Sequence, residues 1–211
     1  MAKLPEPPSV DQLAATPPAW RTFGSGGRLW RVYFRASRHP TGWKVFRYWG
    51  PAGSRFDHHL PDASGVGCPQ DRGILYAGLD VQTCLAEVFQ EGRIIDRSDQ
   101  APWLAAFTPT RDLALLDLTG TWCTRIGAST AINSGRRDRA RRWSQALYAA
   151  FPQADGIAYA SSMNGHAVAY ALYERAVDSV PSAPDTHFAL NDPALDLPID
   201  RAATRLGYAV V

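Results

Sequence analysis

Short apolar segments with the alternation of β-strands recur through the middle of the chain, and only two segments there have the spacing of a helix. The strand candidates are residues 29–36, 43–49, 73–80, 103–110, 113–120, 155–161 and 167–175. The helix candidates are residues 81–92 and 137–151. A regular alternation of strands and helices would predict a doubly wound sheet, and this order is irregular. The sequence therefore predicts an α+β domain.

The first helix candidate carries its own start and stop signals. Asp80 stands where a side chain can cap the first turn, and Gly92 is expected to end the helix. Leu85, Val88 and Phe89 form the predicted apolar stripe.

Proline-rich stretches flank the body on both sides. Five prolines and a glycine-rich joint at 24–27 predict an extended arm without regular structure over residues 1–27. Four prolines and several acidic residues follow position 180, and we expect residues 181–211 to form an extension packed on the domain. No repeat or linker interrupts residues 28–180, so they are predicted to be a single domain.

The composition is that of an ordinary globular protein. Of the 211 residues, 45% are hydrophobic and 20% charged, so the chain can bury a core without staples. Charges interrupt the apolar runs well before the roughly 18 residues of a membrane span, and no secretory signal is recognisable. Cys68, Cys84 and Cys123 form no C-x-x-C pair. We therefore expect reduced thiols, a cytoplasmic location and no membrane partner.

Arginine is the dominant cation of this chain. Of the 22 basic residues, only Lys3 and Lys44 are lysines, and the formal net charge is +2. Codon bias is the simplest explanation for the general excess, and the balanced charge gives no argument for nucleic-acid binding. Each arginine is therefore judged by its own surroundings.

One basic run does allow a different interpretation. Gly135–Arg142 holds five arginines within seven residues, which would suit an arginine-rich module that binds nucleic acid without catalysis. The alternative, which we favour, is the solvated start of an amphipathic helix with Trp143 and Leu147 on the opposite face. Positive charge is unfavourable at a helix N-terminus, so this interpretation predicts a negatively charged neighbour.

Common cofactor and metal motifs are missing from the sequence. There is no dinucleotide-binding glycine motif, Walker loop, zinc-protease motif or nucleophile elbow. The histidines lack the spacing of ligands, so we interpret them as ordinary surface or loop residues and predict no metal site. They are His39, His58, His59, His166 and His187.

Three polar side chains interrupt apolar segments in the first half of the chain. Arg31 faces either solvent or a polar pocket, because an unpaired buried guanidinium is costly. Arg55 lies in a loop from which it can reach a ligand. Tyr76 is either a core aromatic or part of a pocket.

Three further residues are candidates for chemistry. Glu87 has apolar neighbours in its helix and is either a partly exposed flank residue or a catalytic carboxylate. Ser161 and Ser162 end a strand at a turn, where side chains can surround a cleft. Each of these signals is weak by itself.

Taken in chain order, these residues resemble the RES-domain family, which is named after an arginine, a glutamate and a serine. The matching segments are L-W-R at 29–31, S-R-F at 54–56, I-L-Y-A at 74–77, C-L-A-E-V at 84–88 and D-G-I-A-Y-A-S at 155–161. The resemblance spans about 30–175 with comparable spacing, and the five parts together are more specific than any one of them. It implies a fold similar to ADP-ribosyltransferases, with central β-sheets flanked by helices and residues 28–180 as the catalytic domain.

The resemblance also implies a function. Known RES proteins are toxins of bacterial toxin–antitoxin pairs that consume NAD, and their partners are helix-turn-helix antitoxins that cover the active site. For this chain it implies cleavage of the nicotinamide–ribose bond of NAD without a metal and without direct binding of nucleic acid. Both a homo-oligomer and a hetero-oligomer with the antitoxin are compatible with it.

Carried over residue by residue, the resemblance assigns the site. Arg31, Glu87 and Ser161 match the family's named residues and are the expected catalytic group. Arg31, Arg55, Tyr76 and Ser161 are the expected NAD-binding residues. A carboxylate at Glu87 suits an oxocarbenium-like transition state, and arginines suit a diphosphate.

Two questions stay open at this stage. Water, phosphate or a protein side chain could attack the ribose once nicotinamide has left, so hydrolysis, phosphorolysis and ADP-ribosylation of a protein target are all allowed. Ser161 and Ser162 are adjacent, so the sequence does not decide which hydroxyl acts.

Overall fold

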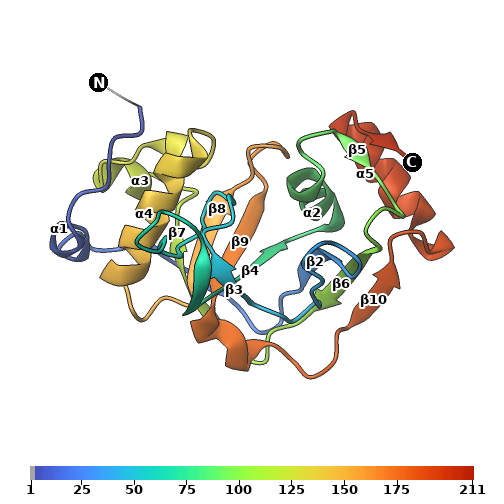
Figure 1. Ribbon diagram of the computed structural model, residues 1–211, viewed down its shortest axis with the longest axis horizontal. Helices are drawn as coiled ribbons and strands as arrows, with labels where there is room; N and C mark the ends of the chain where they lie inside the picture. Colours follow the sequence, from blue (N-terminus) through green and yellow to red (C-terminus); the bar gives the residue numbers. More distant parts are fainter. Residues whose placement is uncertain (1–2) are drawn as a thin grey trace.

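The computed structural model describes residues 3–211, and nine strands in this range form one mixed sheet with helices against it (Figure 1). The order across the sheet is β1 (Trp20–Phe23), β7 (Leu113–Asp117), β8 (Gly156–Ala160), β9 (Val168–Tyr173), β4 (Cys68–Gly78), β2 (Leu29–Phe34), β6 (Pro102–Phe107) and β10 (Thr186–Ala189). β3 (Arg47–Gly50) pairs with β4 outside this path. β7 and β8 run parallel, and the other neighbours are antiparallel. The predicted α+β domain with a central sheet and flanking helices is confirmed.

The helices gather at the two ends of the sheet in the view of Figure 1. α1 (Val10–Ala14), α3 (Trp122–Arg125) and α4 (Arg137–Ala150) lie at one end, and α2 (Val81–Val88) and α5 (Asp196–Leu206) lie at the other. Two short strands, β5 (Ile94–Ile95) and β11 (Ala209–Val210), pair beside α5. Within residues 3–211, no helix has the length and hydrophobicity to cross a membrane.

α2 begins as predicted and ends earlier. Asp80 caps it by accepting a hydrogen bond from a backbone N–H of the first turn at 2.6 Å. The predicted end at Gly92 is wrong, because the helix stops at Val88 and Phe89 already leaves the helical conformation. Leu85 is fully buried, whereas Val88 is exposed and does not belong to the buried stripe.

Two predicted strands have different bounds in the structure. The candidate at 43–49 forms a strand only over Arg47–Gly50, because Trp43 and Phe46 turn into the core before it. The candidate at 73–80 begins earlier, at Cys68, because β3 supplies a partner for the added residues.

The prediction that residues 1–27 lack regular structure is wrong. The prolines flank two elements without interrupting them: α1, which starts in a capping box formed by Ser9 and Gln12, and β1, which pairs with β7 at the sheet edge. Leu4 and Leu13 are buried in the same cluster as Trp143. This segment is therefore part of the hydrophobic core.

The C-terminal residues complete the opposite side of the domain. β10 adds to β6 as the last strand of the sheet. α5 packs on α2, and Leu195, Ile199 and Ala202 are buried with Leu85 in one cluster.

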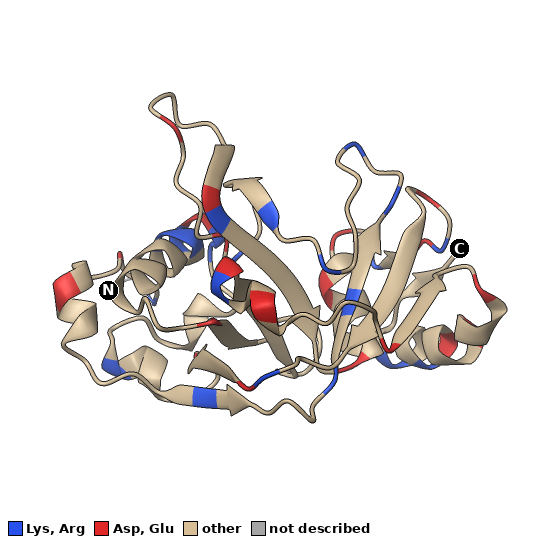
Figure 2. Cartoon of the chain, turned by 90° about the horizontal axis from the view of Figure 1, so that it is seen from below, with Lys and Arg blue, Asp and Glu red and all other residues tan. Residues whose placement is uncertain are grey.

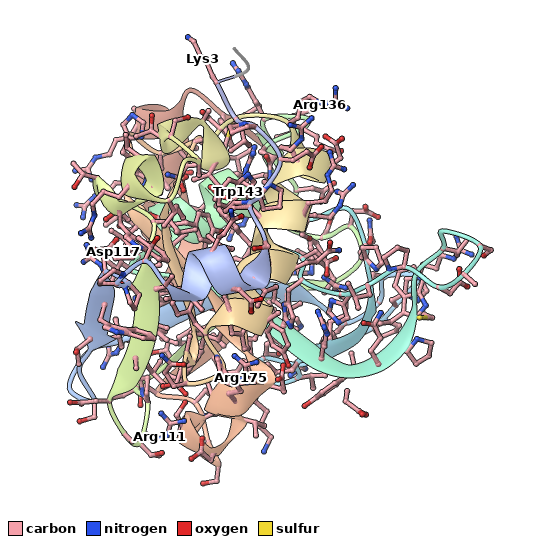
Figure 3. The ribbon with its side chains drawn as sticks, turned by 90° about the vertical axis from the view of Figure 1, so that its left-hand side faces the viewer. Lys3, Arg111, Asp117, Arg136, Trp143 and Arg175 are labelled. Atoms are coloured by element: carbon pink, nitrogen blue, oxygen red, sulfur yellow. The ribbon has the colours of Figure 1, made fainter. Side chains whose placement is uncertain are left out.

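The arginine run at the start of α4 is paired with carboxylates. Glu6 accepts from Arg142 at 2.7 Å and lies 3.0 Å from Arg139, while Asp138 pairs with Arg136 at 2.9 Å. Trp143 donates to a backbone carbonyl of the N-terminal segment, which crosses α4 beside it (Figure 3). The predicted acidic neighbour and the amphipathic helix are both confirmed. In the view of Figure 2, basic and acidic residues are interspersed over the fold and do not gather in separate regions.

Candidate active site

A fork in the sheet opens into a cavity. Two strands pair in turn with β4. β3 pairs first, with its Arg47 opposite Ile74 of β4, and β2 pairs further along, with its Trp30 opposite Gly78 of β4. Between these points β2 and β3 diverge, and Tyr76 lies in the fork. A cavity of about 790 Å³ lies there, lined by residues from β2, β3, β4, α2 and α4. Its volume is in the range of pockets that enclose whole small-molecule ligands.

Arg31 reaches this cavity from β2 without a matching carboxylate. Its Nε is buried and has no hydrogen-bond partner within residues 3–211, and Nη2 donates to the carbonyl oxygen of Val45 at 3.3 Å. Burial lowers the pKa of Arg31 to about 10, which leaves the guanidinium charged at neutral pH. A buried cation with free donors is costly unless it meets an anion, so Arg31 favours an anionic ligand.

Three more arginines line the same cavity. They are Arg47, Arg55 and Arg137, and the lining contributed by residues 3–211 includes only two carboxylates, Glu87 and Glu91. Arg55 is fixed by donating from Nη1 to the carbonyl oxygen of Gly135 at 2.5 Å. Burial and the nearby charge of Arg137 lower the pKa of Arg55, although Glu87 opposes this shift. The excess of positive charge is what a phosphate-bearing ligand requires.

Glu87 is held in place by the predicted serine. The Oγ of Ser161 donates to Oε1 of Glu87 at 2.6 Å and accepts from the backbone N–H groups of Met163 and Asn164 at 3.1 Å each. Ser161 is fully buried, whereas Ser162 is exposed and lines the cavity. The two serines therefore differ in role: Ser161 positions Glu87, and Ser162 faces the ligand space.

The turn after β8 is also tied to α2, a feature the sequence analysis missed. Asn164 donates from Nδ2 to the hydroxyl of Thr83 at 2.9 Å, and Gln82 donates to Oδ1 of Asn164 at 2.6 Å. These bonds fix the helix that carries Glu87 against the strand end that carries Ser161. The polar turn at Asn164 was the available signal, but its partner could not be read from spacing.

Two tyrosines give the cavity an aromatic wall. The hydroxyl of Tyr76 is buried without a hydrogen-bond partner in the described part of the chain, and burial raises its pKa. The ring of Tyr159 packs on Phe56 with centroids 4.6 Å apart, and burial raises its pKa as well. A smaller space of about 50 Å³ lies between Tyr76, Arg31 and Glu87. Both phenols therefore stay neutral and can stack on a ring or donate to it.

The five histidines were expected to be surface or loop residues, and His58 and His59 lie in a loop but not at the surface. Both are fully buried, and His59 donates from Nδ1 to Asp57 at 2.5 Å. Their rings stack with centroids 5.2 Å apart. No group of three His, Cys, Asp or Glu side chains within residues 3–211 has the geometry of a metal site.

Of the predicted site residues, Arg31, Arg55, Tyr76 and Glu87 converge on one cavity, and Ser161 supports it from behind. The sequence did not predict Arg47 and Arg137 as members of this site: Arg47 lies in a strand candidate without a motif, and Arg137 belongs to the arginine run at the start of α4.

Comparisons with known proteins agree with this fold. The protein is similar in structure to a chain in the crystal structure of the M. tuberculosis MbcT–MbcA toxin–antitoxin complex. The two chains are 16% identical in sequence, and the TM-score is 0.55. The match covers 91% of this chain and 96% of that chain. No curated protein sequence matches. The family described as "RES domain" matches residues 28–200, most of the chain, and the protein therefore belongs to the RES-domain family.

Proposed function

We propose that this protein is the toxin of a toxin–antitoxin pair and that it cleaves the nicotinamide–ribose bond of NAD. One observation carries the proposal: a carboxylate, Glu87, is fixed by a buried serine at the edge of a cavity with an excess of arginines. Membership of the RES-domain family and the likeness to a chain of a toxin–antitoxin complex support it.

Glu87 is assigned the reacting end of the substrate. When the bond between nicotinamide and ribose breaks, its electron pair leaves with neutral nicotinamide and positive charge develops on the sugar. A carboxylate that accepts a hydrogen bond from the ribose 2′-hydroxyl stabilises this charge more in the transition state than in the ground state. Ser161 occupies one oxygen of Glu87 and leaves the other for the substrate.

The remaining cavity residues bind the substrate. Arg31 and Arg55 supply forked donors for the diphosphate, which would relieve the unpaired buried charge of Arg31. Tyr76 and Tyr159 supply an aromatic surface for nicotinamide and exclude water from the breaking bond.

The partner of such a toxin is proposed to be a small helix-turn-helix antitoxin that covers this cavity. A cavity built for a diphosphate also accepts a carboxylate, so an acidic or C-terminal group of the partner would bind near Arg31 and Arg55.

The protein, purified free of any bound partner, should release nicotinamide from NAD without added metal. Chromatography of the products with and without phosphate measures the activity and identifies the acceptor. Free ADP-ribose as the product indicates hydrolysis, and a phosphorylated ADP-ribose indicates phosphorolysis. ADP-ribose attached to a protein indicates ADP-ribosylation. NAD that stays intact at high enzyme concentration contradicts the proposal.

Ser161→Ala should lower the turnover of NAD about tenfold and the stability by about 1 kcal/mol. The variant frees Glu87 to rotate and leaves two backbone N–H groups without their acceptor. Kinetics and thermal melting measure both effects. Ser162→Ala is the matched control, with melting expected at the wild-type temperature. A larger loss of kcat in this control than in Ser161→Ala would contradict the assigned roles.

A further inference from the structure

Asp57 is a buried carboxylate that the proposed chemistry does not use. It is fully buried next to the cavity and accepts hydrogen bonds from three donors. These are Nδ1 of His59 at 2.5 Å, Nη2 of Arg47 at 3.0 Å and the backbone N–H of Ala52 at 2.5 Å. Burial alone would raise its pKa, but the bonds from His59, Arg47 and Ala52 lower it to about 2. Asp57 is therefore ionised at neutral pH.

Two of its three partners belong to the cavity wall. Arg47 lines the cavity from β3, and its guanidinium also donates from Nη1 to the carbonyl oxygen of Trp49. One edge of the planar group is thus fixed, while about 31% of the side chain stays exposed. Ala52 starts the loop that leads to Arg55, and both residues line the cavity. Asp57 therefore holds a cavity cation directly and the cavity loop through its backbone.

Arg47 faces the same space as Arg31. Arg31 lines the cavity from β2 and Arg47 lines it from β3, the two strands that diverge around Tyr76. Burial is the main cause of the lowered pKa of Arg31, and the charge of Arg47 adds a smaller contribution. Arg47 lies opposite Ile74 on β4, two residues before Tyr76. Two neighbouring cations repel each other unless an anion lies between them. Within the described residues, Asp57 is the only carboxylate that pairs with either of them, and it is fully buried, whereas the side chain of Arg47 is partly exposed.

We propose that Arg47 is a further diphosphate-binding residue of the cavity and that Asp57 is the residue that positions it. The identity of the anion as the diphosphate of a dinucleotide rests on the proposed function, whereas the anion site rests on the geometry of Arg31, Arg47 and Asp57. In this arrangement Arg31 and Arg47 bind the anion from the two branches of the fork. Asp57 fixes the direction of the Arg47 donors, so that less side-chain freedom is lost on binding.

Inorganic pyrophosphate is the probe that tests the anion site without turnover. Calorimetric titration should show that Arg47→Gln weakens pyrophosphate binding about tenfold or more, the usual weight of charge-assisted hydrogen bonds. Arg47→Lys keeps the charge but cannot bridge Asp57 and the Trp49 carbonyl with a planar fork, so it should lose most of the same affinity.

Arg72→Gln is the matched control. Arg72 donates to the carbonyl oxygen of His58 at 2.9 Å and lies over the ring of Tyr148, outside the cavity. Its replacement removes the same charge and should leave pyrophosphate binding unchanged.

The role of Asp57 is tested by Asp57→Asn with NAD as substrate. If Asp57 positions a residue that binds ground state and transition state alike, KM should rise about tenfold and kcat should change less than twofold. A merely structural Asp57 would lower the melting temperature and leave the KM of the folded fraction unchanged. If Asp57→Asn does not fold, the comparison of Arg47→Lys with Arg47→Gln decides the point.

The outcomes separate this inference from the proposed function. Wild-type protein that cleaves NAD, together with Arg47→Gln protein that binds pyrophosphate and NAD as tightly as wild type, overturns the inference alone. Arg47→Lys with wild-type affinity overturns the positioning role of Asp57. Wild-type protein that leaves NAD intact but binds pyrophosphate through Arg47 overturns the proposed function and keeps the anion site.

Discussion

Replacing Glu87 by glutamine should lower the kcat of NAD cleavage by about 100-fold or more while KM changes little. Glutamine keeps the shape of the side chain and its contact with Ser161, but it removes the negative charge opposite the developing oxocarbenium ion. Steady-state kinetics on the purified variant measures the loss, and thermal melting shows that the fold is intact.

The control for this variant is Glu6→Gln. Glu6 is an exposed carboxylate that pairs with Arg139 and Arg142 of α4, far from the reacting group, so the same change of chemistry there should leave turnover unaffected. A Glu87→Gln protein that melts normally and cleaves NAD at the wild-type rate would end the proposed mechanism.

Replacing Arg31 by methionine should weaken NAD binding and, in the same variant, stabilise the protein in the absence of NAD. The KM for NAD is expected to rise by about 10-fold or more, because a charge-assisted contact is lost. Methionine fills a similar volume without the cost of a partly buried guanidinium that has a buried, unbonded Nε and no carboxylate partner among the described residues. The melting temperature should therefore rise, by about 2–4 °C for each kcal/mol gained in a chain of this size.

Arg111→Met is the matched control for stability. Arg111, which is labelled in Figure 3, precedes β7 and pairs with Asp155 at 2.9 Å and Asp178 at 2.8 Å. Its removal leaves a buried carboxylate without its cation, so this variant should melt below the wild type with normal NAD kinetics. An Arg31→Met protein that also melts below the wild type would show that its charge is already compensated in the free protein.

The reacting part of the site could be predicted because its residues are tied to local elements. Glu87 lies in a helix whose start is marked by its cap, and Ser161 directly follows a strand. The order and spacing of the sequence motifs were therefore enough to indicate both residues. The contact between them, over a separation of 74 residues, needed the structure. Arg47 lies outside any motif and becomes part of the site through the pairing of β3 with β4.

The buried network around Asp57 could not be predicted from the sequence. His58 and His59 lack the spacing of metal ligands, which predicted surface or loop residues, and nothing in the sequence indicated that they are buried. Burial depended on the aromatic rings of Tyr148 and Tyr173, which come from α4 and β9, and on Asp57. The long-range contacts that create this environment leave no periodic signal.

The N-terminal error has a similar origin. The proline content predicted an arm without regular structure. The prolines themselves do lie outside helices and strands, but the residues between them pack on or pair with segments far along the chain. β1 has no local partner, and its pairing with β7 joins Trp20 to Leu116. A strand that depends on a distant neighbour is invisible to local propensity.

The two edge strands of the sheet, β1 and β10, lie far apart in the sequence. Each has four residues and is shorter than the strand that it pairs with, β7 or β6, so fewer unpaired backbone groups face other chains at the edges. During synthesis β1 cannot pair until β7 has been made, and β6 lacks its partner β10 until residues 186–189 have left the ribosome. Such late pairing between segments far apart in the sequence slows folding. It also prolongs the time during which unpaired strand edges can associate with other chains. Newly made chains of this protein therefore depend on residues 186–189 to cover β6, whose edge stays available to other chains until then.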